Sequence, residues 1–194
     1  MRSANSVSQA PFFARPIEAY QKRKNKYAEL GFEPDPDELA SYAGLSRTAA
    51  VDRLLAHPLR QAVTAVPADL AVYPPQPEQF KELSPDEKKQ FRQQQAQRNL
   101  ELQAWWIEEM IATPAPLTEH MTMFRHNHFL SSSQKVKSAL LMLRQNELLR
   151  CYALGNFDDM LHAVAKDPAM ILYLDTQQDR KAQPNENFAR EVME

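Results

Sequence analysis

The sequence predicts an all-α fold, a multi-helix orthogonal bundle with a long proline-rich loop and no substantial sheet. Apolar residues recur at helical spacing, and no segment alternates with period two for long enough to form a strand. Prolines and polar N-cap residues stand repeatedly where such segments begin. The 194 residues include 14 prolines and 3 glycines, a balance that favours helices separated by rigid breaks.

The composition also excludes several classes of function. Its 23 basic and 25 acidic residues give a net charge of -2, so no overall positive field attracts nucleic acid or an anionic membrane. Three scattered glycines cannot build the glycine-rich phosphate loops of common nucleotide-binding proteins. The sequence has neither a signal-peptide pattern nor an apolar run of about 18 residues. We therefore expect a cytoplasmic chain without a transmembrane segment.

The first region, residues 1–56, is expected to end in a helical hairpin. Asp35 is a candidate N-cap followed by proline, and Gly44 is the stop of this short helix. Ser46 begins a second helix that ends before Pro58. Its apolar stripe consists of Ala50, Val51, Leu54 and Leu55.

The second region, residues 57–83, is rich in proline and has little periodicity. We expect a loop that wraps over the surface and is the weakest part of the fold.

The third region, residues 84–194, is the main helical region. Ser84 and Glu87 form a capping box that begins a helix reaching about Ile111, with deep packing only in its second half. After the break "TPAP" comes a segment that contains "MFRHNHF". A long helix is then predicted from residue 133 to the stop at Gly155.

Two further helices complete this region. Asn156 is expected to cap the first, and Pro168 begins a turn that leads into "AMILYLD". Pro184 and Asn185 start the last helix, which reaches the end of the sequence without a stop signal. We therefore expect one incomplete domain that is cut within this helix.

The first candidate site is the pair of histidines in "MFRHNHF". On a helix, residues two positions apart point about 200° apart, so His126 and His128 cannot grip one metal ion, and no metal site is expected. Leu117, Met121, Phe124 and His128 share one helical stripe, which predicts that His128 faces the core in a hydrogen-bonded structural role. The alternative is that one histidine lines a polar pocket.

The second candidate site is the polar turn "NENFARE". Glu186 and Arg190 are four residues apart, so the simpler prediction is an ion pair within the helix. The functional alternative makes Glu186 an acid, base or ligand and lets Arg190 orient an anion. Arg144 and Asn146 interrupt an apolar helix and could satisfy these groups across a helix interface.

Other reactive residue types have ordinary interpretations. Cys151, the single cysteine, is expected to be a small buried packing residue, because Arg150 beside it points about 100° away. Trp105 and Trp106 are expected in the core rather than as ligand-stacking rings.

Several motifs occur together in a fixed order: "WWIEEMIATPAPLTEHMTMFRHNHF", then "RQNELLRCYALGNFDDMLHAVAKDPAMILYLD", then "NENFARE". This order resembles the large bacterial family catalogued as domain of unknown function 1800. The resemblance is strong over residues 100–194 and weaker over "GFEPDPDELASYAGLSRTAAVDRLL". It implies no activity, because none is established for the family, and it implies a longer protein, since members continue past the last helix. Many relatives resemble exported proteins, which opposes a cytoplasmic location.

The resemblance carries over nine polar positions, whereas Arg125 and Ala182 depart from the tryptophan and glycine common in the family. The nine matching residues are His126, Asn127, His128, Arg144, Asn146, Asn185, Glu186, Asn187 and Arg190.

Two hypotheses for the function remain open. In the first, the chain is part of an enzyme of hydrolytic type, with His126, His128, Glu186 and Arg190 as its catalytic residues and a pocket completed by a missing C-terminal part. In the second, it is a non-catalytic helical scaffold or interaction module in which the same residues form a buried hydrogen-bond network. The sequence identifies no substrate, cofactor or partner.

Overall fold

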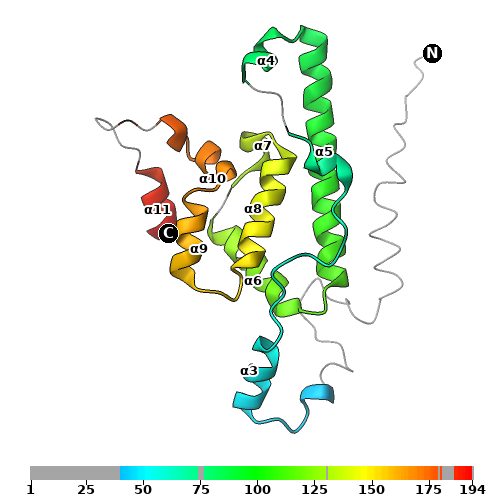
Figure 1. Cartoon of the computed structure of the whole chain (residues 1–194), viewed down its shortest axis with the longest axis vertical. Helices are drawn as coiled ribbons and strands as arrows, with labels where there is room; N and C mark the ends of the chain where they lie inside the picture. The colour runs from blue at the N-terminus through cyan, green and yellow to red at the C-terminus, as the bar shows by residue number, and fades with distance from the viewer. Residues whose placement is uncertain (1–39, 74–76, 130, 179, 181–185, 194) are drawn as a thin grey trace, which may run out of the picture.

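The computed structural model of the chain describes residues 40–73, 77–129, 131–178, 180 and 186–193 (Figure 1). Over these residues the regular elements are helices and no strand occurs, so the predicted all-α class is confirmed.

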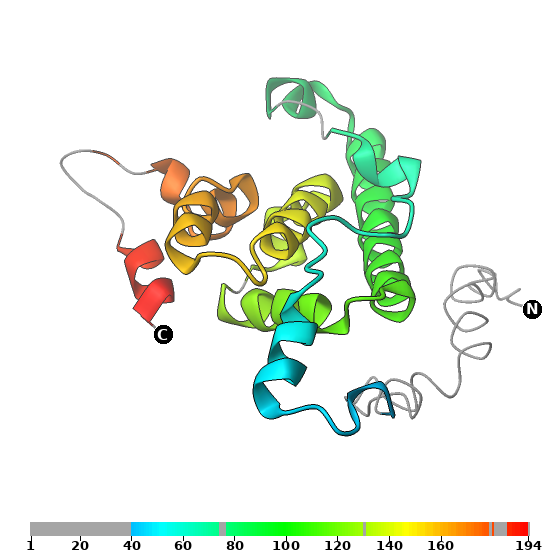
Figure 2. The same cartoon turned by 60° about the horizontal axis from the view of Figure 1, so that its bottom comes forward.

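The helix at the centre of the molecule is α8 (Ala139–Cys151). It packs against α5 on one side and against α9 and α10 on the other, with α6 and α7 also in contact (Figures 1 and 2). The bounds of these five neighbours are α5 (Pro85–Ala112), α6 (Pro116–His128), α7 (Ser133–Val136), α9 (Phe157–Val164) and α10 (Pro168–Tyr173).

The buried apolar side chains form separate clusters along α8. On the α5 side, Leu143 of α8 packs with Trp105, Ala139 and Leu70. On the α9 side, Leu149 packs in a second cluster, whose other buried members are Phe129, Met160, Val164, Met170 and Leu174. Because α8 contributes to both clusters, its position couples the two sides of the molecule.

Helix starts agree closely with the predicted caps. The Ser84 side chain accepts a hydrogen bond from the backbone N–H of Glu87 and the Glu87 carboxylate accepts one from Ser84, which completes the capping box of α5. Asn156 accepts bonds from the first backbone donors of α9, and Ser46 does the same for α3 (Arg47–Leu55). These caps satisfy N–H groups that have no partner within their helix.

The long helix predicted from residue 133 to 155 is instead two helices. Lys137 has a φ of 57°, in the left-handed region, and the chain restarts at Ser138, whose side chain caps α8. The C-terminal end also differs, because α8 stops at Cys151 and Gly155 follows only after a turn. Apolar periodicity continues through the break, which explains why the pattern alone predicted one helix.

The proline-rich loop is more ordered than its sequence indicates. The predicted loop region, residues 57–83, contains a short 3-10 helix, η1 (Ala68–Ala71), and the helix α4 (Pro77–Glu82), neither of which was predicted. The Leu70 side chain of η1 is 0% exposed and packs against Trp105 and Leu143. The loop therefore contributes to the core.

A buried carboxylate also holds the first part of this loop. Glu109 of α5 is 0% exposed, and its oxygens accept hydrogen bonds from the backbone N–H groups of Val63 and Thr64 at 2.8–3.0 Å. The Thr64 hydroxyl donates to the same carboxylate at 2.6 Å. The sequence pattern of the loop predicted neither the Leu70 contact nor the Glu109 contact.

The apolar stripe of the second hairpin helix is not buried in the core. No residue of α3 is buried, and Val51, Leu54 and Leu55 are exposed. In Figure 1, α3 lies at the lower end of the molecule, beyond α6. Gly44 does end the preceding turn with a φ of 82°, while the cap predicted at Asp35 lies outside the described residues.

The last described helix is α11 (Asn187–Met193). Its Phe188 and Val192 side chains pack against the cluster that contains Leu149. The predicted start at Pro184 and Asn185 lies outside the described residues. None of the helices described is both long enough and apolar enough to cross a membrane.

Candidate functional site

The buried face of α6 is polar, which contradicts the stripe predicted to face the core. Thr118, Glu119 and Thr122 are buried, whereas Phe124 is 56% exposed. The physical reason is that α8 and α5 supply charged and hydrogen-bonding partners for this face, so its polar groups can leave water. Apolar periodicity cannot reveal such partners because they belong to distant segments.

The two histidines diverge as predicted, but their expected roles are exchanged. The His126 ring lies against the Trp106 ring with centroids 4.7 Å apart, and its Nε2 is 3.2 Å from the Asn146 Nδ2 of α8. His128 is half-buried and makes an edge contact with Phe129 at 4.6 Å. His126 is therefore the histidine that takes part in interior hydrogen bonding.

A buried ion pair lies beside His126. Arg150 of α8 donates to Glu119 from Nε at 2.6 Å and from Nη2 at 3.0 Å, a two-point geometry in which both guanidinium and carboxylate are planar. Arg150 is 1% exposed and Glu119 is 3% exposed. The Arg150 guanidinium also lies over the Trp105 ring, 5.5 Å from its centroid.

The Trp106 side chain joins the ion pair to the histidine. Its Nε1 donates to Glu119 Oε2 at 3.0 Å while its ring contacts His126. We call the five connected side chains the polar network; they are Trp106, Glu119, His126, Asn146 and Arg150. The polar network ties α5, α6 and α8 together, and removing Arg150 would leave the buried Glu119 carboxylate without its charged partner.

The environment of His126 favours its neutral form. Burial lowers the pKa of His126 from 6.5 to about 4, and the positive charge of Arg150 acts in the same direction. A neutral imidazole can accept a hydrogen bond from the Asn146 amide at Nε2 and keep its proton on Nδ1. Among the described residues, no group of three or more histidine, cysteine, aspartate or glutamate side chains could hold a metal ion.

The second predicted cluster has different contacts from those expected. Within the described residues no ion pair joins Glu186 and Arg190; instead the Arg190 Nη2 donates to Asn187 Oδ1 at 2.8 Å. The Asn187 Nδ2 donates to the backbone oxygen of Leu174 at 3.0 Å. This turn therefore fixes α11 beside the end of α10, and Glu186 is exposed.

The remaining predicted site residues do not join the polar network. Arg144 is exposed and lies over the Tyr73 ring, 4.9 Å from its centroid, so it does not bridge to the α11 turn as expected. Asn127 is exposed, and Asn185 lies outside the described residues. Of the predicted site residues that the structure describes, His126 and Asn146 meet in the polar network, and Asn187 and Arg190 meet in the α11 turn.

Sequence reasoning missed Glu109, Glu119 and Arg150, although a signal for two of them was present. Glu109 stands four residues after Trp105, and Arg150 stands seven residues after Leu143, so each continues a core-facing stripe. A charge at a core position of a helix indicates a buried partner. Glu119 gives no such signal, because the residues buried with it on α6, Thr118 and Thr122, are themselves polar.

The expectation for Cys151 is wrong, since its side chain is exposed. The residue lies at the end of α8, where it lines a small pocket with Arg150 and the loop residue Arg60. It has no disulfide partner, because the sequence contains one cysteine.

Comparison with known proteins identifies a family. The family model described as "Protein of unknown function (DUF1800)" matches residues 26–194. No curated protein and no solved structure matches the chain significantly.

Proposed function

This chain belongs to the DUF1800 family of proteins of unknown function, and from that premise we propose that its helical region is a non-catalytic scaffold or interaction module. The polar network is then a structural device that fixes α5, α6 and α8 relative to one another. The observation that carries this proposal is the pairing of buried groups: Glu119 accepts from both Arg150 and Trp106, and His126 is bonded to Asn146.

The protonation state of His126 supports a structural role. A general base is most effective when its pKa lies near the working pH. With a pKa of about 4, His126 remains neutral at neutral pH but is a weak acceptor for a substrate proton. Its Nε2 is also already engaged by Asn146.

The hydrolytic enzyme remains the alternative proposal. It requires the segment from His126 to His128 and the turn from Asn185 to Arg190 to line one pocket. Among the described residues, no hydrogen bond or ion pair connects these two segments, and Arg190 is engaged by Asn187. No contact among the described residues favours the alternative over a structural role.

Replacing His126 by leucine tests the proposal without knowledge of a substrate. The substitution leaves the buried Asn146 amide without its partner, which costs about 1–3 kcal/mol of unfolding free energy. Residues held for catalysis commonly lower stability, so their replacement tends to raise it. We expect urea denaturation to show a destabilised but cooperatively folding His126→Leu protein.

Arg190→Ala is the matched control, because Arg190 is exposed and outside the polar network. We expect it to change the unfolding free energy by less than about 0.5 kcal/mol. A His126→Leu protein more stable than the parent would contradict the structural role and favour the enzyme.

A further inference from the structure

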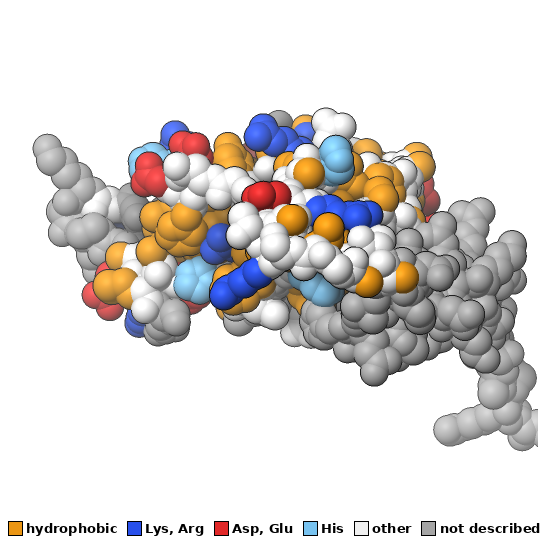
Figure 3. Space-filling model, turned by 90° about the horizontal axis from the view of Figure 1, so that it is seen from below, with side chains coloured by type: hydrophobic (Ala, Val, Ile, Leu, Met, Phe, Trp, Pro, Cys, Tyr) orange, Lys and Arg blue, Asp and Glu red, His pale blue; other side chains and the backbone are white. Residues whose placement is uncertain are grey.

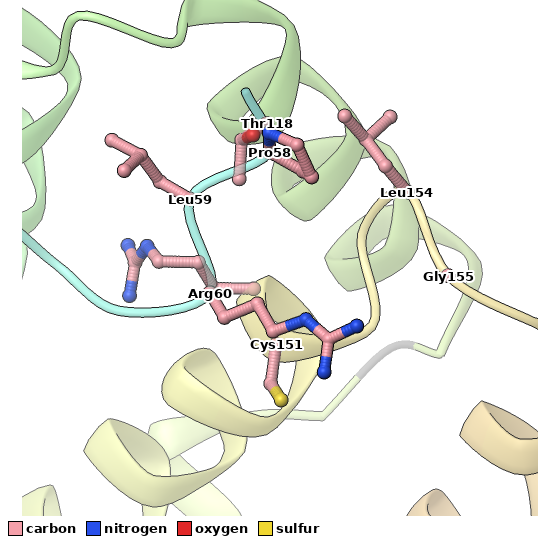
Figure 4. A pocket seen from close by; sticks show the side chains of 8 residues that line it. Pro58, Leu59, Arg60, Thr118, Cys151, Leu154 and Gly155 are labelled. Atoms are coloured by element: carbon pink, nitrogen blue, oxygen red, sulfur yellow. The ribbon is translucent and has the colours of Figure 1, made fainter. Parts of the chain in front are cut away.

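A small pocket of about 40 Å³ lies beside the polar network, between the start of the proline-rich loop, α6 and the end of α8 (Figure 4). Its walls include Pro58 and Arg60 from the loop, Thr118 from α6, and Arg150, Cys151 and Gly155 from α8 and the turn after it. Arg60 and Cys151 are exposed, whereas Arg150 and Thr118 are each 1% exposed. The pocket therefore leads from the surface to buried polar groups.

Two of these buried groups have no hydrogen-bond partner among the described residues. They are the Arg150 Nη1 and the Thr118 Oγ1. Glu119 occupies the Nε and Nη2 of Arg150, which leaves the two hydrogens of Nη1. Arginine does not lose its proton in proteins, so Nη1 remains a donor and costs free energy while unpaired.

The charge around the pocket favours an anion. Glu119 compensates the charge of Arg150, and Arg60 adds a further positive charge with no acidic residue in the pocket lining. The carbonyl oxygens at the end of α8 would repel an anion, but those of Leu148 and Arg150 accept bonds from Tyr152 and Ala153. Figure 3 shows the lower face of the molecule, where basic and acidic side chains both lie among apolar ones.

We propose that this pocket binds an oxyanion, the carboxylate or phosphate group of a small ligand. Arg150 Nη1 and Thr118 Oγ1 are the buried donors available to oxygens of this group, and Arg60 pairs with its exposed side. The volume of about 40 Å³ exceeds the roughly 10–15 Å³ that a cavity needs to hold one water but is far below that of an ordinary ligand pocket, so it suits a compact head group better than a large ligand. This inference goes beyond the proposed scaffold role and does not depend on it.

Thermal unfolding of the whole chain with added inorganic phosphate or acetate tests the proposal. A ligand that binds the folded state raises the Tm as its concentration increases past its Kd. Chloride at matched ionic strength is the reference for non-specific screening. We expect at least one of the two oxyanions to raise the Tm above the chloride reference, and which one does so identifies the head group.

Three variants connect any such effect to the pocket. Thr118→Val keeps the side-chain shape and removes the hydroxyl donor, and Arg60→Gln removes the exposed charge. Isothermal titration calorimetry should show that each weakens oxyanion binding by about tenfold, the effect of losing one charge-assisted contact. Arg47→Gln, an exposed arginine on α3, should bind as the parent does.

The proposal is overturned if neither oxyanion raises the Tm above the chloride reference. It is equally overturned if Thr118→Val and Arg60→Gln both bind with the parent's affinity, because the effect then comes from an adventitious ion only. The proposal is also overturned if crystals grown with the effective oxyanion show only water beside Arg150 Nη1.

Discussion

At the residue scale, burial lowers the pKa of one interior group and raises the pKa of another. Burial and the charge of Arg150 lower the pKa of His126 to about 4. Burial raises the pKa of Asp167, although hydrogen bonds from Met170 and Gln145 oppose this rise. Both groups therefore make the stability of the fold depend on pH, with contributions of opposite sign.

The contribution of His126 predicts a loss of stability in acid. Because its folded pKa of about 4 is below the value of 6.5 in the unfolded chain, the unfolded chain binds more protons between these values. The contribution of neutral His126 to the free energy of unfolding is thus fully present above pH 6.5 and is lost as the pH falls toward 4. We expect the unfolding free energy to drop by about 2 kcal/mol between roughly pH 7 and 5 from this group.

Urea denaturation of the parent and of His126→Gln at both pH values isolates this contribution. Asp167 is present in both proteins, so its effect cancels in the difference. His128→Gln is the control, since it removes a half-buried histidine from the same helix and should keep the parent's acid sensitivity. Equal acid sensitivity in His126→Gln and the parent would refute the assignment.

At the element scale, each helix is defined by its caps and by the partners of its buried face. The caps are local: the Ser84 hydroxyl meets a backbone N–H three residues away, and Asn156 meets those of the residues two and three positions further on. The sequence therefore predicted where α5 and α9 begin. The buried face of α6 depends on Arg150, 31 positions from Glu119, and such a contact has no local pattern.

The same distinction explains which site predictions succeeded. Two histidines two positions apart on a helix must diverge, so this prediction followed from helix geometry alone. Which histidine faces inward depends on Trp106 and Asn146, which belong to other helices. Hydropathy favoured His128 because the apolar side chains of α6 are on its stripe, although Phe124 of that stripe is exposed.

The break between α7 and α8 predicts that Lys137→Gly stabilises the fold. A non-glycine residue held at a φ of 57° destabilises the folded state by about 1–2 kcal/mol, and replacement by glycine removes this strain. Glycine also has more conformational freedom in the unfolded chain, which offsets up to about 1 kcal/mol of this gain. We expect a net gain of about 0.5–1 kcal/mol in urea denaturation. Lys137→Val should change stability in the opposite direction, and a stabilised valine variant would disprove the strain argument.

The Glu109 anchor predicts local opening of the loop when its charge is removed. In Glu109→Gln, the new side-chain amide would present a donor toward the N–H groups of Val63 and Thr64, so at least one bond to a charged acceptor is lost. We expect hydrogen exchange at these two backbone amides to accelerate by about tenfold or more. Glu108→Gln, one position away on α5, is the control and should leave their exchange unchanged.

At the scale of the whole molecule, α8 organises two apolar clusters, and the loop supplies part of one of them. Leu70 is the buried contribution of η1, and it packs against α5 through Trp105 and against α8 through Leu143. The loop is thus attached by an apolar contact at Leu70 and a polar one at Glu109. Losing the apolar contact at Leu70 should lower the free energy of unfolding of the whole fold rather than only open the loop locally.

Leu70→Ala is therefore expected to lower the unfolding free energy by about 2–5 kcal/mol, through lost burial and the cavity left behind. Val72→Ala, two residues away and 44% exposed, should change it by less than about 0.5 kcal/mol. Thermal denaturation of both variants measures the difference. Equal effects would show that η1 does not belong to the core.

The anchoring of the loop has a consequence for the order of assembly. Val63, Thr64 and Leu70 precede their partners Glu109 and Leu143 in the chain, so the earlier segment has nothing to dock onto until the later helices exist. Bringing together residues this far apart in the sequence costs conformational entropy before the contact between them forms and stabilises the chain. During synthesis, residues 63–70 therefore remain unpacked until α5 and α8 have emerged from the ribosome.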